Sequence, residues 1–220
     1  MSAATPPAAA AAAVPAKPLA SKPLPWLVPG IVAGSLVPLA ALAYRGGTGG
    51  LGANPVAEAL NQLGLAALIL LIASLACSPL RTIFGWTWPI RIRKTLGLAA
   101  FFYASLHVLT YVGLDQVLDW GSILSDITER KFIAVGLLAF LLLIPLAVTS
   151  TSGMLKRLGV KRWKRLHRLT YAAAALAVVH FVWRVKIDLT EPAIYGAVLA
   201  LLLALRLLPE RAGKRRAAAP

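Results

Sequence analysis

Residues 166–183, LHRLTYAAAALAVVHFVW, form an apolar stretch close to the roughly 20 residues that a helix needs to cross a bilayer. Two of the chain's three histidines, His167 and His180, lie in this stretch, and the third, His107, lies in another apolar stretch. The 220 residues are 59% hydrophobic and 14% charged, whereas an ordinary soluble domain is about 45–50% apolar and about 25% charged. The sequence therefore predicts an integral membrane protein without a second sizeable soluble domain.

The membrane domain is predicted to be an all-α, polytopic bundle of six transmembrane helices that occupies residues 26–208. Its apolar segments are residues 26–44, 55–77, 95–114, 131–150, 166–184 and 192–208. The Ala- and Pro-rich residues 1–25 lack hydrophobic periodicity and are predicted to be a disordered cytoplasmic tail. The basic residues 209–220 are predicted to form a second cytoplasmic tail.

The net charge of +15 is distributed between the apolar segments rather than along one soluble face, which indicates membrane topology and not nucleic-acid binding. Most Lys and Arg residues fall on one side of the predicted bundle. The exceptions are Arg45, Arg130, Lys131, Arg184 and Lys186. Because cytoplasmic loops carry the excess of positive charge, both termini are expected in the cytoplasm.

With this orientation, the third and fifth segments run outward, so that His107 and His180 should face each other at a similar depth. A lone membrane histidine can simply hydrogen-bond a neighbouring helix, but ionisable groups inside a membrane are functional candidates. Two facing imidazoles suit iron or another transition metal. The single cysteine, Cys77, excludes a cysteine-based cluster. A haem needs only axial ligands from the protein, and we therefore predict that His107 and His180 ligate haem iron.

His167 lies about 20 Å deeper than His180 along the same helix. A matching partner on the third segment would fall near Arg93 and Lys94, so a second, inner haem lacks its obvious second ligand. Two interpretations of His167 stay open. One is contact with a cofactor, and the other is an interfacial or quinone-binding role.

Three motifs resemble the MsrQ family, the haem-binding membrane subunits of the bacterial periplasmic methionine-sulfoxide reductase system, and more broadly the ferric-reductase-like transmembrane domains. They are RKTLGLAAFFYASLHVLTYVGLDQ (93–116), PLAVTSTSGMLKRLGVKRWKRLHRLTY (145–171) and VVHFVWRVK (178–186). In this resemblance, which covers residues 26–208, His107 and His180 match the family's haem histidines. His167 matches its additional histidine.

The resemblance implies a six-helix protein of the bacterial inner membrane that holds haem b, with a second haem left open, and associates with FMN. It implies that electrons come from the quinone pool or a cytosolic flavin reductase. They would pass to a periplasmic, molybdenum-containing catalytic subunit that repairs oxidised proteins. This chain would carry electrons without holding the methionine-sulfoxide reductase active site.

Other functions compete with this prediction. A small transporter or proton relay could use the histidines as titrating groups, and it predicts a colourless protein. An intramembrane hydrolase needs a serine beside a histidine, but Ser105 and His107 are two residues apart and point to different helix faces. The basic residues around Arg162, Trp163 and Arg165 reflect topology, or they form a docking surface for a flavin phosphate or an acidic reductase.

Overall fold

The computed structural model describes residues 24–185 and 187–206, so residues 1–23 and 209–220 of the two predicted tails lie outside the described residues. The described chain folds into helices and loops, without a β-strand in these two ranges. The long helices are α1 (Leu27–Gly47), α2 (Pro55–Phe84), α3 (Trp88–Thr110), α5 (Lys131–Val148), α8 (Leu169–Arg184) and α9 (Thr190–Leu205). The short elements are the π-helical turn η1 (Tyr111–Asp115), α4 (Trp120–Glu129), α6 (Ser152–Leu158) and α7 (Val160–Leu166).

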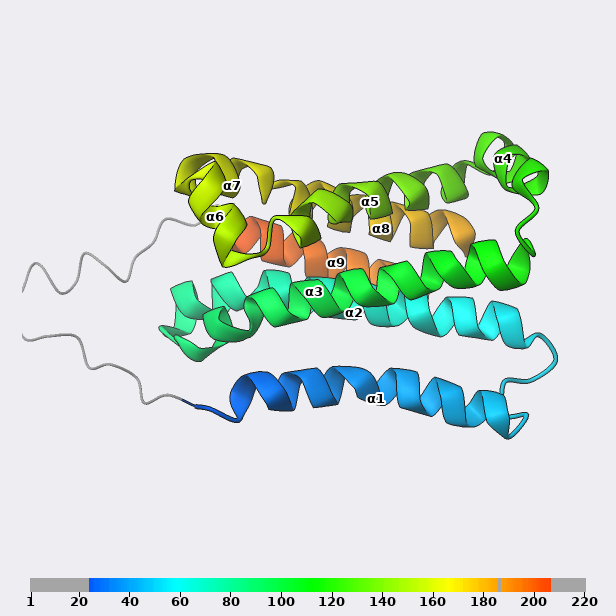
Figure 1. The fold of residues 1–220 in the computed structure, drawn as a ribbon, viewed down its shortest axis with the longest axis horizontal. Helices are drawn as coiled ribbons and strands as arrows, with labels where there is room; N and C mark the ends of the chain where they lie inside the picture. The colour runs from blue at the N-terminus through cyan, green and yellow to red at the C-terminus, as the bar shows by residue number, and fades with distance from the viewer. Residues whose placement is uncertain (1–23, 186, 207–220) are drawn as a thin grey trace, which may run out of the picture.

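The long helices form one bundle, with α1 along one edge and α5 along the opposite edge (Figure 1). Helices α6 and α7 lie at the same end as the start of α1, and α4 lies at the other end (Figure 1). Five helical stretches, residues 27–47, 55–84, 88–115, 131–148 and 160–184, are long and apolar enough to cross a membrane, and α9 is a shorter apolar helix. The prediction of an all-α, multi-pass membrane bundle is confirmed.

The boundaries of the second and third predicted segments differ from the structure. Helix α2 continues past residue 77 through Pro79 to Phe84, and α3 already begins at Trp88. The basic residues predicted to lie in a loop therefore sit on helix ends: Arg81, Arg91, Arg93 and Lys94. Hydropathy marks the edge of the hydrocarbon, but a helix continues beyond it until its backbone is interrupted. That interruption is Gly85, which ends α2 with a φ of 71°.

Helix α4 was not predicted because ten residues are too few to span a membrane. Its N-cap is Asp119, whose carboxylate accepts hydrogen bonds from the backbone N–H groups of Gly121 and Ser122 at 2.9 and 3.3 Å. The hydroxyl of Ser122 also donates to Asp119, and these bonds hold the pKa of the carboxyl below its usual value. Helix α4 thus begins at a well-formed cap outside the membrane-spanning stretches.

A tyrosine hydroxyl joins α1 to the rest of the bundle. Tyr103 of α3 is 1% exposed, donates to the carbonyl oxygen of Ser35 at 2.6 Å and accepts from the N–H of Leu39 at 3.1 Å. An uninterrupted helix would pair these two backbone groups with each other, and Pro38 lies between them. In a membrane, where no water satisfies backbone groups, this contact holds α1 against α3.

Helices α5 and α8 pack closely against each other. Ala173 and Ala174 of α8 are fully buried, and they belong to a core cluster with Leu143 and Leu146 of α5. Small residues let membrane helices pack backbone to backbone. This close packing sets the relative position of α5 and α8, and with it the position of the histidine on α8.

Candidate metal centre

His107 of α3 and His180 of α8 come together inside the bundle. Their ring centres lie 6.2 Å apart, and the ring planes are inclined at 83°. The two histidines come from helices that are far apart in sequence, and they meet at one level as their depths predicted. Both side chains are half-buried.

Each imidazole is held in place by a backbone carbonyl of a neighbouring helix. The Nδ1–H of His107 donates to the carbonyl oxygen of Leu60 on α2 at 2.9 Å, and the Nδ1–H of His180 donates to that of Phe132 on α5 at 2.7 Å. A carbonyl can only accept, so the proton is on Nδ1 and the lone pair is on Nε2 of each ring. Histidines that bind metals are usually oriented by such a bond from the other ring nitrogen.

A glycine leaves room for each ring. Gly64 and Gly136 each lie four residues after the carbonyl that binds the histidine, on α2 and α5 respectively. A Cβ atom at Gly136 would lie 2.5 Å from Nδ1 of His180, and one at Gly64 would lie 3.2 Å from Nδ1 of His107. Both sides of the site therefore repeat one arrangement, in which a missing side chain lets an imidazole reach the helix backbone.

The histidines line a cavity of about 390 Å³ enclosed by residues of α2, α3, η1, α4, α5 and α8. Most of its wall is apolar, and its polar groups include Tyr111, Arg130 and Arg184. Sequence reasoning found the two histidines but missed Gly64 and Gly136. The available indication was a glycine inside each apolar helix. Glycine lowers helix stability at such a position, so its presence can indicate that a neighbouring group needs the space.

The spacing of the rings fits two ligands on opposite faces of one iron. Because a metal–imidazole bond is about 2 Å long and the ring centre lies about 1 Å further back, such rings place their centres about 6 Å apart. The described residues contain no group of three or more His, Cys, Asp or Glu side chains that could hold an ion. The donor set therefore fits a metal that brings further ligands with it, as a porphyrin does.

Comparison with known proteins assigns the chain to a family. Residues 61–178 match the ferric reductase like transmembrane component family. A protein of Rhodospirillum rubrum named protein-methionine-sulfoxide reductase heme-binding subunit MsrQ is 53% identical over 185 residues, which cover 84% of this chain and 89% of the relative. The chain belongs to the MsrQ family. Proteins of the same name from Deinococcus radiodurans and Caulobacter vibrioides are 51% and 48% identical over 82% and 76% of this chain, and over 89% and 79% of their own lengths.

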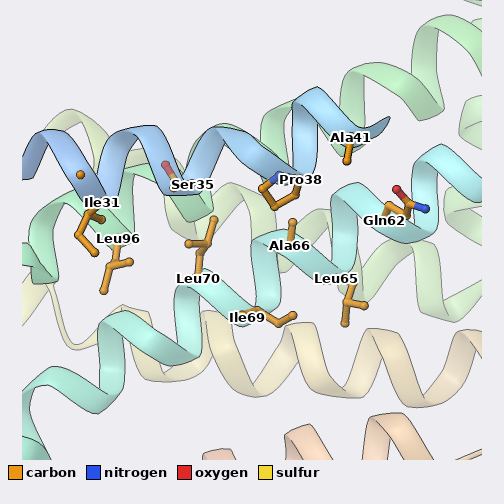
Figure 2. Close-up of a pocket in the computed structure, with 12 residues that line it drawn as sticks. Ile31, Ser35, Pro38, Ala41, Gln62, Leu65, Ala66, Ile69, Leu70 and Leu96 are labelled. Carbon is orange, nitrogen blue, oxygen red and sulfur yellow. The ribbon is translucent and has the colours of Figure 1, made fainter. Parts of the chain in front are cut away.

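This member of the MsrQ family has a second hollow, which lies between α1, α2 and α3 and has a volume of about 460 Å³. Figure 2 shows Pro38 of α1 opposite Ala66 of α2, and Ile31 of α1 beside Leu96 of α3. Its lining residues include Ser35 and Gln62 but no ionisable side chain. Because none of these lining residues is a histidine, we place the candidate metal centre at the histidine cavity.

His167, which the resemblance predicted to match an additional histidine of the family, is not among the residues that line the histidine cavity. Its Nε2 lies 3.1 Å from Oγ1 of Thr149 at the end of α5, and its ring stacks on Trp163 at 3.9 Å. Trp163 in turn donates to the carbonyl oxygen of Thr149 at 2.9 Å. These contacts join the α7–α8 junction to α5, and a cofactor or quinone contact of His167 stays a prediction.

Proposed function

We propose that this chain is a haem-binding electron-transfer subunit, with haem b held between His107 and His180 as its axial ligands. The observation that carries the proposal is the facing pair of imidazoles, each oriented by a carbonyl so that Nε2 is available to a metal. The names of the relatives, which call them heme-binding subunits, support it. When bound, the haem supplies one-electron redox chemistry.

The surrounding residues hold and shield the site. The carbonyls of Leu60 and Phe132 fix the orientation of the rings and raise the basicity of Nε2. Apolar side chains such as Phe140 and Leu143 line the cavity. Axial ligands, burial and hydrogen bonding are the means by which a protein adjusts the potential of a haem.

We further propose that the chain lies in the bacterial inner membrane with both termini in the cytoplasm. The basic helices α6 and α7, with Arg162 and Arg165 exposed, then face the cytoplasm. His107 and His180 sit near the opposite end, because α3 leads into η1 and α4 soon after His107. This depth supports delivery of electrons on the periplasmic side.

The donor is proposed to be the quinone pool or a cytosolic flavin reductase, and the acceptor a periplasmic, molybdenum-containing methionine-sulfoxide reductase subunit. The sulfoxide is then reduced on that partner, and this chain supplies electrons for protein repair. FMN is proposed to associate at the cytoplasmic end, where Arg162 and Arg165 can bind a phosphate. His167, at the same end, is proposed to contact the incoming donor or a cofactor.

The ligand assignment is tested by visible spectra of the purified chain, oxidised and reduced with dithionite. We expect Soret and alpha bands in the wild-type protein and their loss or large shift in His107→Ala and His180→Ala. Gly34→Ala is the control, since no atom lies within 4 Å of its added Cβ and it should keep the bands of this site. Unchanged bands in both cavity variants would refute the assignment.

A further inference from the structure

The polar groups of the histidine cavity gather at one end. Toward the middle of the bundle the wall is apolar, with Leu71, Leu143 and Ala173. Toward α4 it carries the side chains of Asn61, Tyr111, Asp115, Arg130 and Arg184. A ligand with one apolar edge and one acidic edge would therefore bind in a single orientation.

Arg184 is the cation closest to the candidate ligands along the chain, one helical turn after His180 on α8. Its guanidinium donates to the side-chain oxygen of Asn61 and lies 5.7 Å from the centre of the Phe181 ring. The side chain is half-buried. Throughout the described part of the chain, no carboxylate lies within 4.0 Å of it. Glu191, in the first turn of α9, acts on Arg184 electrostatically from beyond that distance. A half-buried cation in a membrane protein is costly without a direct anionic partner, so Arg184 is suited to pair with an acidic ligand.

Arg130 also lines the cavity, two residues before the Phe132 carbonyl that binds His180. Its Nε lies 3.0 Å from a carboxylate oxygen of Asp126 in an ion pair, which leaves the terminal N–H groups free to bind a second anion. The side chain is 57% exposed, so water weakens its interactions more than those of Arg184. Asp115 also lines the polar end of the cavity near α4, which we call the mouth, and its negative charge would repel an anion. Asp115 is exposed, however, and its Oδ2 accepts a hydrogen bond from Gln116 at 3.1 Å.

We propose that this mouth binds the two propionate carboxylates of the haem, with Arg184 as the principal partner and Arg130 as the second. The inference rests on the proposed function and deepens it. Guanidinium groups bind carboxylates through two parallel hydrogen bonds, which gives orientation as well as affinity. The acidic edge of the haem then faces the α4 end of the bundle, the side from which the proposed acceptor takes electrons.

The test compares two porphyrins that differ only in their carboxylates. Apoprotein of the full chain in detergent is titrated with iron protoporphyrin IX and with its dimethyl ester, and the dissociation constants are read from the Soret band. We expect the wild-type chain to bind the free acid about tenfold or more tightly than the ester, because each charge-assisted pair is stronger than a neutral one. Arg184→Leu should lose most of this preference, and Arg130→Leu a smaller part.

Arg45→Leu is the matched control. Arg45 lies at the same end of the bundle, pairs with Glu58 at 3.4 Å and does not line the cavity, so its removal should leave the preference unchanged. General damage to the fold weakens both porphyrins together, so the ratio reports the carboxylates. If Arg184→Leu binds neither porphyrin, Arg184→Gln is a second neutral variant with the same expected loss of preference.

Equal binding of acid and ester by the wild-type chain would overturn the carboxylate site while leaving the proposed function intact. A preference that persists in the neutral Arg184 variants would overturn the role of that residue. A wild-type chain that develops no Soret band with either porphyrin would overturn the proposed function itself, and this inference with it.

Discussion

Substituting Gly136 by alanine is expected to disrupt the candidate site far more than the same substitution at Gly64. The new Cβ would lie 2.5 Å from Nδ1, 2.8 Å from Cε1 and 3.1 Å from Cγ of His180, against 3.4–4 Å for an ordinary contact. The ring would overlap the methyl group by about 1 Å. Because the obstacle faces the nitrogen that donates to Phe132, the ring cannot move aside and keep that 2.7 Å hydrogen bond.

Overpacking of this kind costs about 1–3 kcal/mol, and loss of the hydrogen bond to Phe132 adds about 1 kcal/mol. In the free protein the imidazole can turn away, so the cost appears when ligand binding requires His180 to return. A cost of about 2–4 kcal/mol corresponds to haem binding weakened by about 30- to 1000-fold. Gly64→Ala, where the Cβ would lie 3.2 Å from His107, needs a much smaller shift, and we expect less than a tenfold effect.

The assay is a Soret titration of each apoprotein with haem, with helix content checked by circular dichroism. Gly34→Ala is the control, because no atom lies within 4 Å of its added Cβ, and it should bind haem like the wild-type chain. Wild-type affinity in Gly136→Ala, or a larger loss in Gly64→Ala than in Gly136→Ala, would refute the argument from ring packing.

Two further predictions concern parts of the fold outside the histidine cavity. Tyr103→Phe leaves the Leu39 N–H and the Ser35 carbonyl without the bridging hydroxyl and should destabilise the protein by about 1–3 kcal/mol in thermal unfolding. The haem spectra should not change. An unchanged melting temperature would contradict this prediction. Asp119 caps α4 with its pKa lowered by the Ser122 hydroxyl, so the cap contributes stability above about pH 4 and loses it as the pH falls through the lowered pKa. The protection factor of the amides at the start of α4, which is the intrinsic exchange rate divided by the observed rate, should therefore fall at low pH. In Asp119→Ala it should be low at every pH, and a wild-type protection factor that does not change with pH would contradict the cap.

The meeting of His107 and His180 could be predicted because helix direction and rise per residue determine depth, and depth is most of the information needed inside a bundle. Rotation about each helix axis was the missing part, since it depends on which side chains pack between helices. Gly64 and Gly136 control that packing around the rings. A glycine in an apolar segment can have several roles. Its role here could not be deduced without knowing which side chain of a neighbouring helix lies next to it.

Other features depended on local backbone structure that hydropathy does not report. Helix α2 ends only at Gly85, so the predicted loop directly after residue 77 was wrong. The short helix α4 begins at Trp120 and is capped by Asp119, and such a cap can be recognised in the sequence only once a helix is expected there. The sequence predicted that Arg184 lies on the outer side of the membrane. It did not predict that Arg184 lines the cavity, because this depends on how α8 packs beside α2.

The central claim, that His107 and His180 bind the same haem iron, is tested most directly by electron paramagnetic resonance of the oxidised, haem-loaded protein. Two imidazole ligands make ferric haem low-spin, and ring planes inclined at 83° predict the strongly anisotropic low-spin signal of near-perpendicular axial imidazoles. A high-spin ferric signal from the wild-type protein would show that one of the two histidines does not reach the iron.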